Sequence, residues 1–374
     1  MKKILFAIPT LGGGGAERVL VNLVNSLDKS KYEITVFSLF DGGVNKQYLN
    51  SNIRYKSFFK KLFRGNIHLL KLFSSNLLYK LLIKDEFDIA ISYLEGPTTR
   101  IISGCPFTRT KLINWVHIEI HDKKMLLQSY RSYSELIRSY KKFNRTVFVS
   151  MTAKIAFDKS FPDINTNKEV IYNTVDYSKI ISNADEPISD LEIDNDKINL
   201  VSVGRYTHQK GYERLLMIIK ELANQEKNVH LYLIGKGELE DEYIKIIKEQ
   251  NLERYVTLVG FKTNPYKYVK SCDLFVCSSY SEGFSTAVTE SLIVGTPVVT
   301  TLCSGMEELL GYNNEYGIIT DNNDDALYEG IKSLVEDLDL LKKYREKATL
   351  RGNQLCNENN TIKVEKLLDN LMGM

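Results

Sequence analysis

Apolar residues in the first half of the chain form short runs that alternate with segments of helical period. Residues 3–9 are a continuous apolar run, and AERVLVNLVNSL, after the glycines at 12–15, repeats its apolar residues at helical spacing. Further short apolar runs cover residues 33–39, 87–93, 111–117, 146–150 and 169–172. Brief apolar runs separated by helices are typical of buried parallel strands, so residues 1–177 are predicted to form a doubly wound parallel sheet.

The second half repeats this alternation. INLVSV predicts a strand, YERLLMIIKELAN a helix, and VHLYLIG a second strand that leads into another helix. From residue 324 onward the period and charge pattern predict helices. Between the halves, residues 178–197 are acidic and lack a sustained apolar period, which predicts a linker. A chain of 374 residues exceeds what one core usually serves, so two α/β domains are expected.

The stretch DLFVCSSYSEGFSTAVTESLIVGTPVVT, residues 273–300, organises the second half. Residues 274–277 are an apolar run short enough for a buried parallel strand, so the next loop lies at a carboxyl end of the sheet. Glu282 lies in that loop. A helix is expected to begin at Ser285 or Thr286, to include Glu290 and to end near Gly295.

The two glutamates of this stretch have different settings. Glu282 precedes the helix, where backbone amides favour anions, whereas Glu290 lies more than a turn inside it. One carboxylate can accept hydroxyl hydrogen bonds from one part of a ligand and the other from another part, with a phosphate at the amides of Ser285 and Thr286 between them. This arrangement suits a sugar joined to a nucleotide. A capping acid and a solvated helix glutamate are the simpler alternative.

Cations and glycines follow other predicted strands. Arg205 and Lys210 lie in the turn G-R-Y-T-H-Q-K-G after INLVSV, from where both can reach a diphosphate above the sheet edge. Glycines between a strand and a helix, as at 12–15, let amides approach a phosphate. His117 closes the strand KLINWVH, so it is expected to project from a carboxyl edge.

Composition narrows the class of protein. With 43% hydrophobic and 26% charged residues, both halves can be globular. No apolar stretch is long enough to cross a bilayer, and MKKILFAIPT meets a glycine loop at once, so we expect a cytoplasmic protein without a signal peptide. The five cysteines show no C-x-x-C spacing, which argues against a zinc site or a disulfide framework.

The motif E-G-F-x-x-x-x-x-E-S-x-x-x-G-x-P-V-V resembles the signature of the retaining enzymes of glycosyltransferase family 4. The string G-G-A-E-R-V resembles the N-terminal loop of its bacterial surface-polysaccharide members, and G-R-x-x-x-x-K-G resembles its diphosphate-binding element. The resemblance implies the GT-B fold, two Rossmann-like domains that face each other across a cleft. It implies an acceptor domain at 1–177, a nucleotide-sugar domain at 198–355 and a last helix, 356–374, that crosses back to the first domain.

The resemblance also implies roles for individual residues. The residues expected in catalysis are His117, Glu282, Arg205 and Lys210. The residues expected to bind the donor are Gly14, Gly15, Gly204, Arg205, Lys210, Gly235, Gly283, Phe284, Ser285, Thr286 and Glu290. The implied reaction moves a sugar, with retention, from a nucleotide sugar, favoured to be a UDP-sugar, to a polyprenyl-linked or glycan acceptor. Neither a cofactor nor a metal is expected, because the D-x-D sequence Asp194 to Asp196 lies in the predicted linker.

Three other classes of protein account for parts of this pattern. A nicotinamide-dependent oxidoreductase would explain the first glycines, but G-x-G-x-x-G is absent and the paired glutamates would have no use. A nucleotide-sugar epimerase of GT-B fold would bind a similar donor without an acceptor. A non-catalytic GT-B partner subunit would keep the fold and lose the site. No nucleic-acid partner is expected.

Charge is divided unevenly along the chain. Residues 1–177 carry a balance of +12 and the remainder −10, which predicts an anionic surface facing the first half only. Residues 54–84 hold eight Lys or Arg and no acid. In this region the residues predicted to form an interfacial membrane anchor are Phe58, Phe59, Lys60, Lys61 and Arg64. The following helical segment, 68–84, either packs Leu69, Phe73, Leu77 and Leu81 on the sheet or extends the anchor. The anchor hypothesis predicts a peripheral protein on the inner face of the cell membrane.

Overall fold

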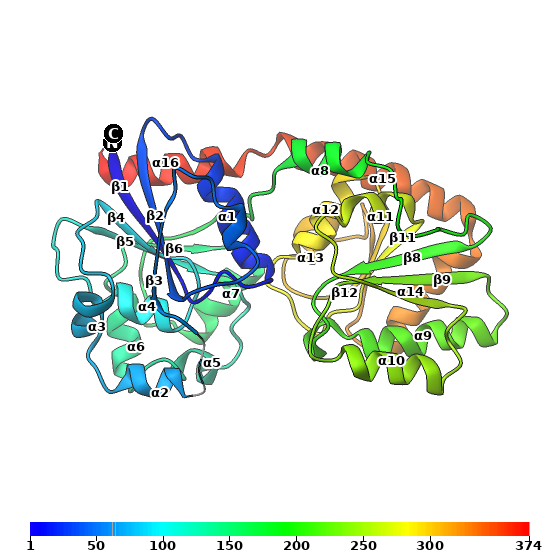
Figure 1. Cartoon of the computed structure of the whole chain (residues 1–374), viewed down its shortest axis with the longest axis horizontal. Helices are drawn as coiled ribbons and strands as arrows, with labels where there is room; N and C mark the ends of the chain where they lie inside the picture. The colour runs from blue at the N-terminus through cyan, green and yellow to red at the C-terminus, as the bar shows by residue number, and fades with distance from the viewer. Residues whose placement is uncertain (62, 64, 374) are drawn as a thin grey trace. The chain divides into compact units, whose positions relative to one another are not determined.

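The computed structural model describes residues 1–61, 63 and 65–373. The chain divides into two compact units, unit 1 (Met1–Val175 with Asn359–Met374) and unit 2 (Asp176–Glu358). Each contains one parallel sheet with helices on both faces, so the predicted pair of Rossmann-like α/β domains is confirmed (Figure 1).

The sheet of unit 1 has the strand order β3-β2-β1-β4-β5-β6-β7, and every pairing is parallel. Its strands are β1 (Lys2–Ile8), β2 (Tyr32–Phe40), β3 (Arg54–Phe59), β4 (Ile89–Ser92), β5 (Lys111–Val116), β6 (Arg145–Phe148) and β7 (Lys168–Val170). The chain order reverses between β1 and β4, so the carboxyl ends of β1, β4 and β5 lie side by side, at the place where open α/β sheets bind ligands.

Helices cover both faces of this sheet (Figure 1). One face is covered by α1 (Gly15–Ser26) and α16 (Asn360–Met372). The other is covered by α2 (Asn66–Lys71), α3 (Ser75–Leu82), α4 (Pro97–Ile102), α5 (Lys123–Leu127), α6 (Tyr133–Tyr140) and α7 (Met151–Ser160).

The sheet of unit 2 has the order β10-β9-β8-β11-β12-β13 and is also parallel throughout. Its strands are β8 (Ile198–Val203), β9 (Val229–Ile234), β10 (Val256–Gly260), β11 (Leu274–Cys277), β12 (Val298–Thr301) and β13 (Ile318–Thr320). The helices of unit 2 are α8 (Tyr177–Ala184), α9 (Tyr212–Asn224), α10 (Glu240–Glu249), α11 (Tyr266–Ser271), α12 (Thr286–Ile293), α13 (Met306–Leu310), α14 (Asp324–Glu336) and α15 (Leu338–Asn357). The order reverses between β8 and β11, which places their carboxyl-end loops together.

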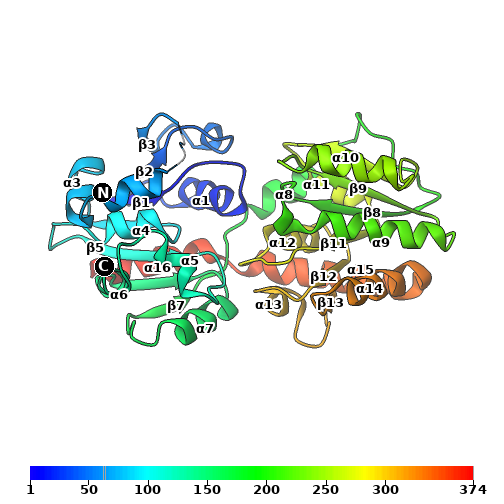
Figure 2. The ribbon, with the colours of Figure 1, turned by 90° about the horizontal axis from the view of Figure 1, so that it is seen from below.

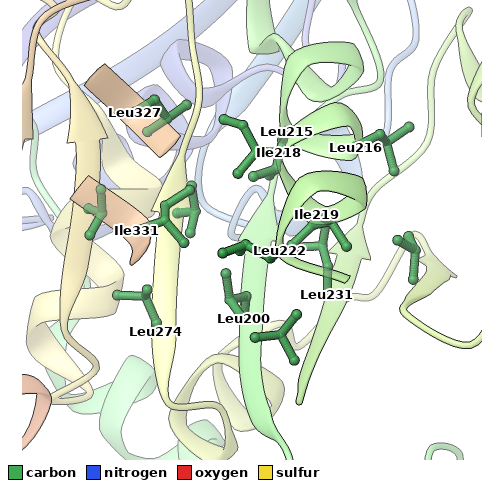
Figure 3. Packing of buried hydrophobic residues seen from close by; sticks show 14 of the residues in the cluster. Leu200, Leu215, Leu216, Ile218, Ile219, Leu222, Leu231, Leu274, Leu327 and Ile331 are labelled. Carbon is green, nitrogen blue, oxygen red and sulfur yellow. The ribbon is translucent and has the colours of Figure 1, made fainter. Parts of the chain in front are cut away.

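The core of unit 2 lies between the sheet and the α9, α10 and α14 layer. Leu215, Ile219 and Leu222 of α9 face Leu200 and Leu231 of the strands, and all five are fully buried (Figure 3). Because this layer is apolar and close-packed, the strand ends above it are held in fixed positions.

The expected linker differs from the structure. Residues 178–197 were predicted to be a separate acidic connection, but α8 occupies the first part of them and belongs to unit 2. The helix is capped by Asp176, whose carboxylate accepts the amide of Lys179, and it buries Ile180 and Ala184 against α11 and α12. Two buried side chains in an eight-residue helix make a weak sequence pattern beside the acidic residues that follow.

Two expectations about residues 54–84 need correction. Phe59 ends the edge strand β3 (Figure 2) and stacks on Phe40 at 5.4 Å between ring centroids, so it packs inward. Leu69, Phe73, Leu77 and Leu81 do not pack on the sheet, because their side chains are 40%, 37%, 42% and 45% exposed. Leu70, Leu78 and Tyr79 are the residues of α2 and α3 that are buried there instead. Of the predicted anchor residues, Phe58, Lys60 and Lys61 are exposed, and Arg64 lies outside the described residues.

Candidate active site

The loop after β11 has the local structure that its sequence predicts. β11 covers Leu274–Cys277 and α12 begins at Thr286. Ser285 is the N-cap of α12, and its hydroxyl accepts the amide of Val288 at 3.4 Å. The loop therefore leaves the carboxyl edge of the sheet and ends on a helix start, with Glu282 between them.

Glu282 is paired with Lys210. The ammonium of Lys210 donates to Glu282 Oε1 at 2.7 Å, and the Ser279 hydroxyl donates to the same oxygen at 2.6 Å. Only 21% of the Lys210 side chain and 10% of the Glu282 side chain are exposed. Burial alone would lower the pKa of Lys210, but the Glu282 carboxylate outweighs it and raises that pKa above its ordinary value. Lys210 is therefore a fixed positive charge at this sheet edge.

The turn after β8 brings Lys210 to this place. Gly211, just after Lys210, has φ +62°, and its backbone lies against the carbonyl of Ser278. A side chain at this position would be strained and would meet that carbonyl, so only glycine lets the turn reach the β11 loop. Arg205, from the same turn, has an exposed side chain, so the structure pairs only one of the two predicted cations with Glu282.

Glu290 lies on α12, in the helical setting that the sequence predicts. Its side chain is half-buried, and the Tyr266 hydroxyl of α11 is 3.4 Å from Oε1. Among the other predicted donor residues, Phe284 and Ser285 are buried, whereas Gly283 and Thr286 are partly exposed. Gly235 has φ +152°, and its backbone lies against the Gly204 carbonyl, so the approach of two strand ends is enough to require glycine there.

In unit 1, the predicted glycine loop contacts an acid. Gly14 is the N-cap of α1, and Gly15 is the first helical residue. A Cβ at Gly14 would collide with the carboxylate of Glu17, which therefore lies against the loop backbone. A carboxylate at a helix N-terminus occupies a position that favours anions, so a phosphate here would compete with Glu17.

His117 follows β5, as the sequence predicts. Its ring contacts that of Tyr93 with centroids 4.7 Å apart, and its backbone amide donates to Glu95 Oε2 at 2.9 Å. Within the described residues, the buried Nε2 has no hydrogen-bond partner. Burial lowers the pKa of His117 to about 3, so the imidazole is neutral near pH 7 and Nε2 is available for one further contact.

Sequence reasoning did not identify Glu95 and Ser279. Glu95 lies in the loop after β4, next to His117, and burial raises the pKa of its carboxyl. Ser279 lies within the stretch 273–300, three residues before the motif, and the sequence assigns it no role, although its hydroxyl donates to Glu282. Both lie two residues after the end of a predicted strand, which is the signal that could have identified them.

Comparison with known proteins identifies the family. The model described as "Glycosyltransferase Family 4" matches residues 13–179, and "Glycosyl transferases group 1" matches residues 183–351. An N-acetylgalactosamine-N,N'-diacetylbacillosaminyl-diphospho-undecaprenol 4-alpha-N-acetylgalactosaminyltransferase of Campylobacter jejuni is 30% identical over 94% of this chain and 95% of the relative. The chain belongs to glycosyltransferase family 4. This confirms the resemblance, and the protein is a glycosyltransferase.

Other matches to this glycosyltransferase are more distant. The lipopolysaccharide core biosynthesis glycosyltransferase LpsD of Rhizobium meliloti is 23% identical over 91% of this chain and 89% of its own. Two solved structures share the GT-B fold over the whole of both chains: Anabaena HepE in complex with UDP and glucose, with a TM-score of 0.74 and 18% identity, and an S. aureus TarM mutant in complex with fondaparinux, alpha-GlcNAc-glycerol and UDP, with a TM-score of 0.75 and 16% identity.

The described part of this glycosyltransferase lacks both a membrane-spanning helix and a cluster of metal ligands. None of its described helices is long and apolar enough to cross a bilayer. The described residues include no group of three or more His, Cys, Asp or Glu side chains that could hold a metal ion.

Proposed function

We propose that this glycosyltransferase moves a sugar from a UDP-sugar to a lipid-linked saccharide in surface-polysaccharide synthesis, with retention of anomeric configuration. The observation that carries the proposal is the group of Lys210, Glu282 and Ser279 at the carboxyl end of β11. A partly buried ammonium beside a carboxylate that can accept hydrogen bonds from hydroxyls suits a sugar that is linked to a diphosphate. The C. jejuni relative, which by its name acts on a diphospho-undecaprenol acceptor, supports the acceptor class.

Each group of the site has a role in this proposal. Lys210 and Arg205 neutralise the diphosphate, Glu282 accepts sugar hydroxyls and Glu290 accepts ribose hydroxyls. His117 Nε2, which is neutral and unpartnered within the described residues, offers one hydrogen bond to the donor sugar. The glycines at 14 and 15 meet a phosphate or sugar only if Glu17 turns away from them.

The reaction needs no protein nucleophile in this scheme. The bond between the anomeric carbon and the diphosphate oxygen breaks, and the leaving UDP takes the electron pair. The acceptor hydroxyl bonds to the same face of the anomeric carbon, and its proton passes to a phosphate oxygen of UDP. The protein stabilises the developing negative charge with Lys210 and Arg205, an electrostatic contribution for which one lost group raises the barrier by roughly 3 to 4 kcal/mol.

The decisive experiment separates donor binding from transfer. A thermal-shift screen over nucleotide sugars, beginning with UDP-N-acetylgalactosamine, is expected to select one donor, because a ligand at 100 times its dissociation constant stabilises by roughly 2.7 kcal/mol. Release of UDP from that donor should require a polyprenyl-diphosphate-linked saccharide. An isomerised sugar nucleotide formed without acceptor would instead show an epimerase, and absence of binding by all donors would show a non-catalytic subunit.

We also propose that turnover requires no divalent metal. In this proposal Lys210 and Arg205 neutralise the charge on the diphosphate. Asp194 of the D-x-D sequence is instead paired with Lys197, with 3.5 Å between Oδ2 and Nζ. Turnover is expected to continue in excess EDTA. Complete loss of turnover on chelation, restored by magnesium or manganese, would contradict this proposal. Asp194 and Asp196 would then be the candidate metal ligands.

A lipid-linked acceptor lies in a membrane, so the enzyme of this proposal has to contact the membrane surface. We propose that an anionic leaflet contacts the lysine-rich apolar surface of unit 1 formed by Phe58, Leu69, Leu72, Phe73, Leu77 and Leu81. Every side chain in this set is at least 37% exposed, and Leu72 reaches 74%. Residues 54–84 include eight Lys or Arg and no Asp or Glu, and one of the eight, Lys56, is paired with Asp85. Each cation near an anionic leaflet is worth about 1 kcal/mol, and the apolar groups add burial.

This surface can be tested with liposomes that contain phosphatidylglycerol. Changing Leu72, Phe73, Leu77 and Leu81 to Ser should abolish flotation and leave turnover of a soluble acceptor analogue unchanged. A matched control changes Leu338 and Leu350 of α15 to Ser, because these are 63% and 54% exposed but belong to unit 2. Unchanged flotation of the first variant would contradict the proposal.

A further inference from the structure

Arg214 is a buried cation that neither the family motif nor the proposed chemistry uses. It lies in the first turn of α9 and is 3% exposed. Its Nε donates to the carbonyl of Ser278 at 2.8 Å, and Nη1 and Nη2 both donate to Asn322 Oδ1 at 3.0 Å. A guanidinium satisfied in this way is fixed in orientation.

Two further contacts complete the arrangement. The guanidinium carbon of Arg214 lies 4.0 Å from the centre of the Tyr280 ring, and the Asn322 amide donates to the Tyr280 carbonyl at 3.0 Å. We call Arg214, Tyr280 and Asn322 the Arg214 clamp. It joins the start of α9 to the loops that follow β11 and β13.

The clamp holds the loop that carries Glu282. Ser278 and Tyr280 lie at the beginning of this loop, and the Ser278 hydroxyl also donates to the Lys210 carbonyl at 2.9 Å. The Gln209 amide donates to the Ser281 carbonyl at 2.8 Å. The residues before Glu282 are thus tied to the turn that presents Lys210.

We propose that Arg214 is a positioning residue for glycosyl transfer, which holds the β11 loop so that Glu282 stays beside Lys210. Arg214 acts through the loop, with Tyr280 and Asn322 fixing its guanidinium. The inference rests on the proposed function, because Glu282 and Lys210 are there assigned to the donor. A lysine cannot replace Arg214, since one ammonium cannot donate in a plane to Ser278 and Asn322 together.

The first test needs no substrate. In the Arg214→Lys variant, amide hydrogen exchange across residues 278–283 is expected to be at least about 10-fold faster than in the native protein, because local opening becomes easier. Arg345→Lys is the matched control. Arg345 donates to the carbonyls of Cys272 and Asp273 at 3.1 and 3.3 Å, at the opposite end of the same strand. It should leave exchange across 278–283 unchanged.

The second test is a kinetic double-mutant cycle with UDP-N-acetylgalactosamine as donor. Arg214→Lys should lower kcat/KM for the donor by roughly 10- to 100-fold, a loss typical of a slightly misplaced catalytic contact. In a Glu282→Gln background the same change should cost less than about 3-fold, because the group that Arg214 positions is already lost. Equal losses in both backgrounds, or an equal loss in Arg345→Lys, would show a merely structural role.

The two tests distinguish a failure of the clamp proposal from a failure of the proposed function. If exchange across 278–283 is unchanged in Arg214→Lys, the clamp is wrong whatever the kinetics show. If exchange accelerates but Glu282→Gln turns over normally, the clamp stands and the proposed role of Glu282 fails. Should Arg214→Lys not fold, Asn322→Ala removes one acceptor of the guanidinium and is expected to give a smaller acceleration in the same segment.

Discussion

At the scale of single residues, the two predicted diphosphate cations differ in their surroundings. Arg205 is exposed, whereas Lys210 is partly buried and bonded to Glu282. An exposed cation contributes little to stability, but removal of Lys210 takes the ion pair away from a carboxylate of low exposure, which keeps the hydrogen bond from the Ser279 hydroxyl. Substitution of Arg205 is therefore expected to lower turnover alone, whereas substitution of Lys210 is expected to lower both turnover and stability.

We predict that Arg205→Ala lowers turnover at saturating donor by at least about 100-fold and changes the free energy of unfolding by less than about 0.5 kcal/mol. Lys210→Ala should lower turnover similarly and also destabilise by about 1 to 3 kcal/mol, since Glu282 loses its cation. Steady-state kinetics and urea unfolding measure both effects. Near-normal turnover in both variants would refute the assignment to the diphosphate.

A second residue-scale prediction concerns His117. Its folded pKa of about 3 lies below its ordinary value of 6.5, so the unfolded chain binds the extra proton more readily. The contribution of the neutral His117 side chain to the free energy of unfolding is fully present above pH 6.5 and is lost as the pH falls from 6.5 towards 3. His117→Gln should therefore flatten the decline of the thermal midpoint over this range. An unchanged pH profile would show that His117 is accessible to protons in the fold.

At the scale of elements, a buried ion cluster supports the surface proposed for the membrane. Arg100 of α4 is 1% exposed and contacts Glu135 of α6 at 3.0 Å. It also donates to the carbonyls of Leu70 and Phe73 at 2.8 and 2.6 Å, which fixes the end of α2. Burial acts to raise the pKa of Glu135, but bonds from Arg131 and Arg100 lower it to about 2. The cluster is therefore ionised at neutral pH.

We predict that Glu135→Gln destabilises unit 1 by about 3 kcal/mol, because Arg100 is left as a buried charge without its partner. Faster hydrogen exchange in α2 should accompany the loss of stability, since Arg100 also holds that helix. Glu253→Gln, on the surface of unit 2, is the control. Equal stability of the two variants would mean that Arg100 finds another partner.

At the scale of the whole molecule, the chain ends by returning to unit 1. The Tyr32 hydroxyl donates to Asp369 at 2.5 Å, and the amide of Asp28 donates to Glu365 at 2.9 Å. α16 also buries Val364, Leu367 and Leu368. Unit 1 is therefore built from both ends of the sequence, and unit 2 from its middle.

Deletion of residues 359–374 should lower the thermal stability of unit 1 and leave that of unit 2 unchanged. The loss is expected to be several kcal/mol, since burying each Val or Leu side chain contributes about 1.5 to 3 kcal/mol. Differential scanning calorimetry should show one transition moving to lower temperature. A shift of both transitions would show that the units unfold as one.

The sequence by itself determined the parts of this protein that depend on local pattern. Apolar runs bounded by glycine and serine located β1, β8 and β11, and the motif placed Glu282 on a loop and Glu290 on a helix. Two parallel α/β domains follow from the alternation of these elements. Weak patterns were missed, as at α8 and at the edge strands β3, β10 and β13, because an edge strand or a short helix buries few side chains.

Only the tertiary structure decided which side chains meet. Arg214 and Asn322 are 108 residues apart in sequence, and Lys210 and Glu282 are 72 apart, so their contacts depend on the order of strands and not on spacing. The same is true of exposure. The period of residues 68–84 is compatible with Leu69 and Leu77 facing the sheet, but the helices present Leu70 and Leu78 to it, because the approach of a helix to its sheet is set by all the elements packed around it.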